Sequence, residues 1–319
     1  MPFNPEKFVS QAIADIKAQV GEGKAVIAVS GGVDSTVTAV LMGRALGENC
    51  VAVFVDTGYM RKNEPETIRG VAKKAGINLR FIDAKAEFYS ALEGVTDPER
   101  KRKVIGERFI RIFEKVAREE KAKFLGQGTL APDWIESGSG LRATIKSHHN
   151  VGGLPKDMDL KLVEPVRELY KDEVRQVGKA LGLPAEVYGR QPFPGPGLAI
   201  RIMGEATPEK AEIIREACAI VEEEVEKAAR EGRMELPWQY FAVILPVKSV
   251  GVLGDARAYG CTVAVRAVES VDCMTAKASR IPPEVLERVA DRITRQLKHC
   301  VNRVVYDVTS KPPATIEWE

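Results

Sequence analysis

The residues best suited to chemistry are residues 30–36, where the sequence reads Ser-Gly-Gly-Val-Asp-Ser-Thr. A short apolar run at 26–29 precedes them, and apolar residues at helical spacing follow over 37–45. Glycines at the end of a strand let the backbone turn sharply and approach an anion closely. A helix that begins there directs its free N–H groups and the positive end of its dipole at the same point. The pattern therefore predicts a site for a phosphate-sized anion.

Two common phosphate-binding motifs are excluded. The chain has no Walker A sequence, GxxxxGK followed by Ser or Thr, and Gly31-Gly32 lacks the third glycine of a dinucleotide fingerprint. Ser-Gly-Gly alone is most often a tight turn. SGGVDS between an apolar strand and an amphipathic helix is far more specific for a binding loop.

The elements that position this loop alternate between strand and helix. Apolar runs at 51–55, 79–82 and 123–125 predict strands, and periodic stretches at 66–75, from Asp97-Pro98 onward and at 171–181 predict helices. We therefore expect an α/β domain over residues 1–190, with a parallel twisted sheet and helices on both faces. Periodicity is lost between about 126 and 160, and so long an irregular stretch predicts an active-site lid.

The second half of the chain has a different order. Pro-Phe-Pro-Gly-Pro-Gly at 192–197 indicates a domain boundary. Beyond it the patterns predict a strand at 198–202, a helix at 208–231, strands at 240–247 and 262–268, a helix at 283–299 and a strand at 303–308. This order predicts a smaller α+β domain over 191–319.

Composition limits the kinds of partner and metal site that the chain is expected to have. The net charge of +2 gives no basic footprint for nucleic acid, and charge runs such as 100–103 and 222–224 predict solvated helix faces. No apolar run is long enough to span a membrane, and the N-terminus does not read as a signal peptide, so we expect a cytoplasmic protein. The five cysteines form no CxxC pair and are expected to be buried apolar residues, and the presence of only three histidines argues against a His-based metal site.

The loop resembles the pyrophosphate-binding loop of the N-type ATP pyrophosphatases, whose fold is adenine nucleotide alpha-hydrolase-like. The resemblance implies that the loop grips the β- and γ-phosphates of ATP and that Asp34 also holds Mg²⁺. An acceptor oxygen then attacks the α-phosphorus, and pyrophosphate leaves. The loop leaves several acceptors open: citrulline, nicotinate adenine dinucleotide, aspartate, or a tRNA uridine or cytidine.

Other segments resemble the synthetase portion of GMP synthases, from about residue 8 to the end of the chain. The matching segments are FVDTG (54–58), KRKVIG (101–106), QGT (127–129), PDWIES (132–137), IKSHHNVGG (145–153), YKDEVR (170–175), RQPFPGPGL (190–198) and KPPATIEWE (311–319). The resemblance implies a ligase of purine biosynthesis. O2 of xanthosine monophosphate (XMP) attacks ATP, and ammonia then displaces AMP at C2 to leave GMP.

The resemblance also assigns residues. The ATP-binding set is Ser30, Gly31, Gly32, Val33, Asp34, Ser35, Thr36, Asp56, Gln127 and Gly128. The catalytic set is Asp34, Asp133, Glu136, Lys146, His148, His149 and Asp172. The XMP set is Arg102, Gln239, Arg303, Lys311, Ile316 and Glu317. Without the resemblance, Lys146, His148 and His149 could be ordinary loop residues, Asp172 a helix start and Arg102 one of several exposed cations.

GMP synthases are often fused to an N-terminal glutaminase with a GxCxG elbow, which this sequence lacks. We therefore expect a separately encoded synthetase subunit that uses free ammonia alone and glutamine only with a glutaminase partner. The resemblance also implies a homodimer formed through the C-terminal domain.

Two rival functions remain open. A tRNA-thiolating or lysidine-forming enzyme shares the loop but usually adds paired catalytic cysteines or a strongly basic face. A nucleotide sensor without catalysis would keep the loop and lose the charged residues of the lid, whereas Asp133, Glu136 and Lys146 are present.

Overall fold

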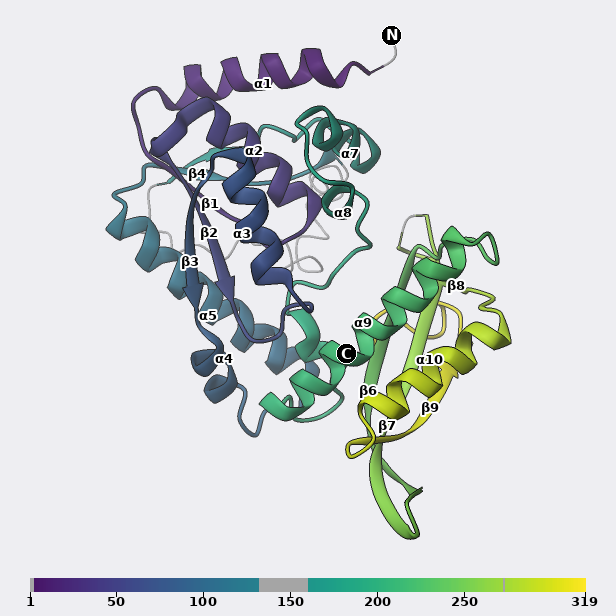
Figure 1. Cartoon of the computed structure of the whole chain (residues 1–319). Helices are drawn as coiled ribbons and strands as arrows, with labels where there is room; N and C mark the ends of the chain where they lie inside the picture. Colours follow the sequence, from purple (N-terminus) through teal and green to yellow (C-terminus); the bar gives the residue numbers. More distant parts are fainter. Residues whose placement is uncertain (1–2, 132–159, 272) are drawn as a thin grey trace. The chain divides into compact units, whose positions relative to one another are not determined.

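The computed structural model describes residues 3–131, 160–271 and 273–319, and the chain forms two compact units (Figure 1). The first unit comprises Met1–Asp56, Asn63–Ala84 and Gly106–Arg190. The second comprises Thr57–Lys62, Lys85–Ile105 and Gln191–Glu319. Two segments that precede Arg190 thus belong to the second unit. A single division of the chain at residue 190 therefore does not separate the two units.

The first unit is built on a parallel sheet with the strand order β3-β2-β1-β4-β5. Its strands are β1 (Ala25–Ala28), β2 (Cys50–Asp56), β3 (Asn78–Asp83), β4 (Phe124–Gly126) and β5 (Lys161–Val163). The predicted parallel sheet is confirmed, although β5 was not expected from the sequence. Because β2 lies on one side of β1 and β4 on the other, the strand order reverses between β1 and β4. Open parallel sheets bind ligands at the carboxyl ends of the strands at such a point.

Helices follow the strands as the periodicity predicts. They are α1 (Pro5–Val20), α2 (Val33–Leu46), the 3₁₀ turn η1 (Gly47–Asn49), α3 (Glu64–Ala75), α5 (Pro98–Glu119), α7 (Lys171–Ala180) and α8 (Ala185–Tyr188). Helix α4 (Lys85–Ala91) and the start of α5, up to Ile105, belong to the second unit. Side chains cap the N-termini of two of these helices. At α1, Asn4 Oδ1 accepts a hydrogen bond from Lys7 N at 3.0 Å, and at α5, Asp97 Oδ1 accepts one from Arg100 N at 2.8 Å. Helix α2 packs on β1, β2 and β4, so the sheet fixes where its N-terminus lies.

The second unit contains a four-stranded sheet covered by α9 (Pro208–Arg230), with α10 (Pro283–Gln296) against α9 and β9. Its strands are β6 (Gln239–Leu253), β7 (Ala256–Glu269), β8 (Lys277–Ala278) and β9 (Val301–Asp307). Strands β6 and β7 are antiparallel, and β9 runs parallel to β7. The predicted α+β layer is confirmed.

One expected strand is absent. Residues 198–202 form the 3₁₀ helix η2 (Gly197–Arg201), and only Ile202 makes a bridge, to Ile244. Gly197 has φ +68° and lies against the backbone of Tyr59, whose carbonyl accepts from Leu198 N at 2.7 Å. A short apolar run shows that a segment is buried and does not specify a strand.

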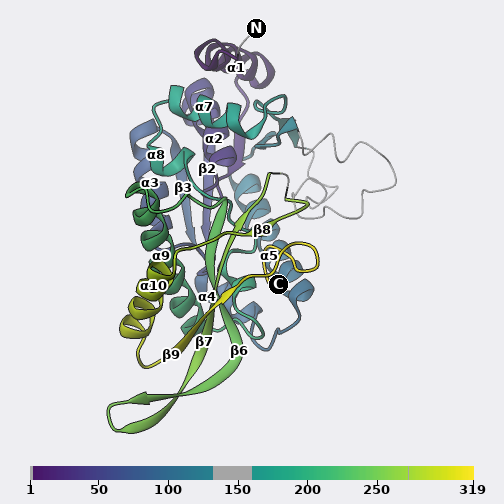
Figure 2. The same ribbon diagram turned by 90° about the vertical axis from the view of Figure 1, so that its right-hand side faces the viewer.

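The β6–β7 hairpin is longer than predicted. Beyond a bulge between Ile244 and Lys248, the two strands continue as a ribbon that extends away from the rest of the second unit (Figure 2). Val250 and Tyr259 lie directly opposite each other on it, and both are exposed. The ribbon therefore presents apolar side chains that nothing in its own unit covers.

Cys50 and Cys218 are buried, as expected from the sequence. Cys273 and Cys300 are exposed, so the expectation of burial was wrong for these two residues. Among the helices that the structure describes, none is both long and apolar enough to cross a membrane.

Candidate active site

The phosphate loop, residues 30–36 at the junction of β1 and α2, is held by its own hydroxyl groups. Ser30 N donates to Ser35 Oγ at 3.2 Å, and the two serine hydroxyls lie 3.1 Å apart. Thr36 Oγ1 donates to Gly32 O at 2.8 Å. Gly32 is the N-cap of α2 and offers no side-chain acceptor to the first N–H groups of the helix. These donors are available to an anion at the positive end of the helix.

The other predicted ATP-binding residues lie at the same edge of the sheet. Asp56 is the last residue of β2 and is buried, and Gln127 and Gly128 follow β4. A Cβ at Gly128 would lie 3.0 Å from the carbonyl of Asp34, so this backbone packs directly on the start of α2. Gln127 Oε1 is buried and has no hydrogen-bond partner among the residues that the structure describes, which leaves an acceptor at this edge.

Asp34, in the first turn of α2, lies 3.7 Å from Lys171 Nζ, measured at Oδ2. Lys171 is the first residue of α7, and its side chain is half-exposed. From the same motif, 170–175, the resemblance assigned Asp172, whose side chain is 88 % exposed and pairs with Arg175 at 3.4 Å. Lys171 is thus one cation next to the loop, and sequence reasoning missed it although it lies in that motif. The catalytic role of Asp172 stays a prediction.

Five predicted catalytic residues cannot be placed. Most of the expected lid lies outside the described residues, and with it Asp133, Glu136, Lys146, His148 and His149.

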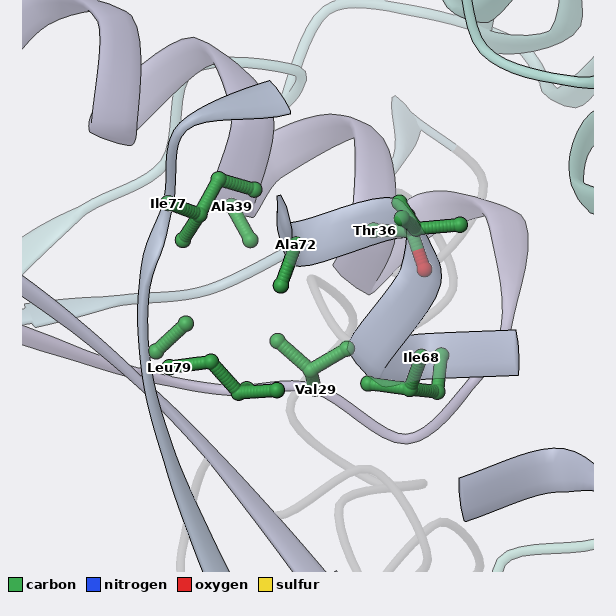
Figure 3. Close-up of a pocket in the computed structure, with 9 residues that line it drawn as sticks. Val29, Thr36, Ala39, Ile68, Ala72, Ile77 and Leu79 are labelled. Carbon is green, nitrogen blue, oxygen red and sulfur yellow. The ribbon is translucent and has the colours of Figure 1, made fainter. Parts of the chain in front are cut away.

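Figure 3 shows a small hollow behind the phosphate loop. It is lined by Val29, Thr36, Ala39, Ala52, Ile68, Val71, Ala72, Ile77 and Leu79. Thr36 is the one polar residue of this lining, and its hydroxyl already donates to Gly32 O. The hollow is therefore a packing gap between β2, β3, α2 and α3 and gives a phosphate no partner.

In the second unit, Glu317 is the centre of a polar cluster. Arg201 donates to its two carboxylate oxygens, from Nε at 3.0 Å and from Nη2 at 2.8 Å, and Gln239 Nε2 donates to Oε1 at 3.0 Å. The guanidinium lies 4.1 Å from the centre of the Phe241 ring, and Arg201 is 1 % exposed. Burial opposes its charge, but the nearby Glu317 carboxylate more than offsets this and raises the pKa of Arg201.

Two further cations, Lys101 and Arg102, contact Glu319. Lys101 Nζ donates to its carboxylate and, at 2.6 Å, to the carbonyl of Ile202, and Arg102 donates to the carbonyl oxygen of Glu319. Burial lowers the pKa of Lys101, and Glu319 partly opposes the shift. Lys101 has no exposed surface and Glu224 is also buried, so the charge runs at 100–103 and 222–224 are not simply solvated faces.

The structure gathers most of the predicted XMP residues near the C-terminal segment, but not Arg303. Ile316 is buried, and Lys311 Nζ donates to Cys273 O at 2.6 Å. Arg303 pairs with Thr262 of β7 and Gln239 with Val268. The two positions are thus six residues apart along β7, roughly 20 Å at the rise of a strand.

The site in the first unit defines a class: a parallel α/β fold with a phosphate loop at its switch point and no Walker lysine. Two protein-family models match, "NAD synthase" over residues 5–112 and "GMP synthase C terminal domain" over residues 223–318.

Proteins similar to nearly the whole chain narrow this class. A subunit of GMP synthase (glutamine-hydrolyzing) from Methanopyrus kandleri is 59% identical over 99% of this chain and 100% of its own. The corresponding subunit from Pyrococcus furiosus is 58% identical over 98% and 97%. GMP synthase (glutamine-hydrolyzing) of Thermotoga maritima is 57% identical over 98% of this chain but only 62% of its own length. The chain belongs to this family of GMP synthase subunits.

Proposed function

We propose that this chain is a carbon–nitrogen ligase that makes GMP from XMP, ATP and ammonia. The observation that carries the proposal is the phosphate loop, with its uncapped helix and Asp34, in a chain of this family. The loop binds the β- and γ-phosphates, and residues 30–36, Asp56, Gln127 and Gly128 form the ATP site.

The reaction has two steps. O2 of XMP attacks the α-phosphorus of ATP, a new P–O bond forms, and pyrophosphate leaves. Ammonia then adds at C2, and the C–O bond breaks to release AMP. The first step is needed because a carbonyl oxygen is a poor leaving group, whereas AMP is a good one.

Mg²⁺ fits the loop chemically. A carboxylate and hydroxyl groups are hard oxygen donors, and Mg²⁺ is commonly held by one or two carboxylates together with substrate phosphates. Asp34 would hold the ion, which when bound would neutralise negative charge on the phosphates of ATP as the adenylyl group is transferred.

The same groups act on the leaving pyrophosphate. The α2 N–H groups face the position where its charge develops, and Lys171 adds a cation beside Asp34. Asp133, Glu136, Lys146, His148, His149 and Asp172 remain proposed parts of the adenylation site.

The XMP site is proposed around Glu317. The Glu317 carboxylate, which Arg201 and Gln239 hold in place, can accept a hydrogen bond from the N–H edge of a purine. The other residues proposed for this site are Arg102, Lys311 and Ile316. Arg303 is too far from Gln239 in one chain to share a nucleotide with it. We therefore assign Arg303 to the XMP site of a second copy.

A homodimer through the β6–β7 ribbon would bring that second copy. Val250, Val252 and Tyr259 are exposed on the ribbon, and Val308 is exposed just beyond β9. Strands with exposed apolar side chains are commonly covered by a symmetric partner.

Ammonia is proposed to come from a separate glutaminase subunit, and we expect the reaction to run in the cytoplasm without nucleic acid. Relatives of matching length are named as one subunit of GMP synthase, which supports a separately encoded partner.

The test is pyrophosphate release from ATP by the purified chain with ammonium and each candidate acceptor in turn. We expect release with XMP, together with AMP and GMP, and none with citrulline, nicotinate adenine dinucleotide, aspartate or tRNA. Glutamine should replace ammonium only when a glutaminase is added. ADP and inorganic phosphate as products would contradict the proposal, and binding without turnover would favour a nucleotide sensor.

A further inference from the structure

We propose that Glu64 and Arg190 are positioning residues that set the phosphate loop through Gly31. The inference rests on the proposed function only in taking this loop as the site of the ATP phosphates. All three residues belong to the first unit.

Glu64 occupies the place where residue 31 would carry a side chain. It is the first residue of α3 and is 1 % exposed. A Cβ built on Gly31 would lie 2.0 Å from Glu64 Oε1 and 2.8 Å from its Cδ. Gly31 also has φ +82°, in the left-handed region that favours glycine. The carboxylate is therefore packed against the main chain of the loop, at its sharpest turn.

Arg190 connects this carboxylate to the loop. Its Nη1 lies 2.5 Å from Glu64 Oε1 and 3.5 Å from the carbonyl oxygen of Gly31. A buried carboxylate next to an anion site would repel a phosphate. The guanidinium neutralises it, so the positive end of α2 keeps its attraction for the ligand.

The contact with the Gly31 carbonyl fixes the direction of the next N–H group. A peptide unit is planar and trans, so the carbonyl of Gly31 and the N–H of Gly32 point in opposite directions. While Arg190 lies on the carbonyl side, the Gly32 N–H is directed away from Arg190 and donates to Ser30 Oγ at 3.4 Å. Two adjacent glycines could otherwise turn this plane at little cost. The pair thus selects one orientation of the peptide between Gly31 and Gly32, and in this orientation a phosphate oxygen can replace the Ser30 hydroxyl as the acceptor of the Gly32 N–H.

The test measures binding of inorganic pyrophosphate with Mg²⁺ by calorimetry, on the full chain and four variants: Glu64→Gln, Glu64→Asp, Arg190→Lys and Arg190→Gln. We expect pyrophosphate affinity to fall by about tenfold or more in Glu64→Gln and Arg190→Gln, the loss expected for one misdirected charge-assisted hydrogen bond. Arg190→Lys keeps the charge but not the geometry of the guanidinium, and Glu64→Asp keeps the charge on a shorter side chain. Both should therefore lose less affinity for pyrophosphate than the two Gln variants.

The control is Arg80→Gln, which removes an arginine that pairs with Glu119 and Glu120 in the same unit. It should leave pyrophosphate affinity unchanged even if it lowers the melting temperature. In turnover, the Glu64 and Arg190 variants should raise KM for ATP and leave KM for XMP within about twofold. Folded variants that bind pyrophosphate like the unmodified chain would overturn the proposal.

The two proposals fail separately. If the unmodified chain released no pyrophosphate with XMP, the proposed function would be wrong. The titration would still decide the role of Glu64 and Arg190, because it needs neither XMP nor turnover.

Discussion

Lys101 and Glu319 form a buried ion pair across 218 residues of sequence. Lys101 Nζ also donates to Ile202 O, and Glu319 Oε1 accepts from Gly204 N at 2.9 Å. A buried charge that loses its partner is strongly destabilising, whereas loss of both charges costs much less.

Glu319→Gln should therefore lower the free energy of unfolding by roughly 3 kcal/mol, the size expected for one partner of a buried pair. Lys101→Met combined with Glu319→Gln should cost less than the sum of the single changes. Urea unfolding measures both. Asp291→Asn, which breaks the exposed pair with Arg295, is the control and should cost about 0.5 kcal/mol or less. Strict additivity would mean that the pair is not coupled.

Glu317→Gln should raise KM for XMP at least tenfold and leave KM for ATP within about twofold, because the amide loses one acceptor and leaves Arg201 without a full counter-charge. Steady-state kinetics with each substrate varied gives the two constants. Equal effects on both substrates would point to a general loss of structure, which circular dichroism would reveal.

Asp34→Asn should reduce turnover by about two to three orders of magnitude while the fold is kept, since removal of one preorganised electrostatic group costs roughly 3–4 kcal/mol. Asp15→Asn is the matched control, because Asp15 lies exposed on α1 in the same unit and accepts a hydrogen bond from Gln11, so a small effect is expected. Near-normal turnover in Asp34→Asn would remove Asp34 from the proposed metal site.

Glu224 should contribute to the pH dependence of stability. Burial raises its pKa, but hydrogen bonds from Arg292 and Arg288 outweigh burial, so its pKa lies below the ordinary 4.5. A lowered pKa means that the unfolded chain takes up the proton first, so this stabilisation is present above about pH 4.5 and is lost as the pH falls through the folded-state value. Glu224→Gln should cost roughly 2 kcal/mol at pH 7, and the difference should shrink toward pH 3. A difference independent of pH would contradict the assignment.

Tyr259→Glu with Val250→Glu should convert a dimer to a monomer, because charges opposite each other on the ribbon would be buried without partners in the interface. Light scattering at micromolar concentration measures the mass. Leu236→Glu, an exposed apolar position in the same unit, is the control and should stay dimeric. A monomeric unmodified chain would refute the dimer itself.

The sequence by itself determined the features that are local. The phosphate loop was predictable because its residues, 30–36, are contiguous, and a strand and a helix of clear periodicity flank them. The parallel sheet followed from the same alternation. Membership of the family followed from motifs spread along the chain.

Only the tertiary structure decided which distant groups hold those features. Arg190 lies 159 residues from Gly31 in sequence, and Arg201 116 residues from Glu317. The sequence pattern around a charged side chain is the same whether that side chain contacts water or a buried partner. Lys101 therefore looked like part of a solvated run, and the apolar segment after Gly197 looked like a strand. Burial is a property of the packed chain, so the chain had to be folded before either could be recognised.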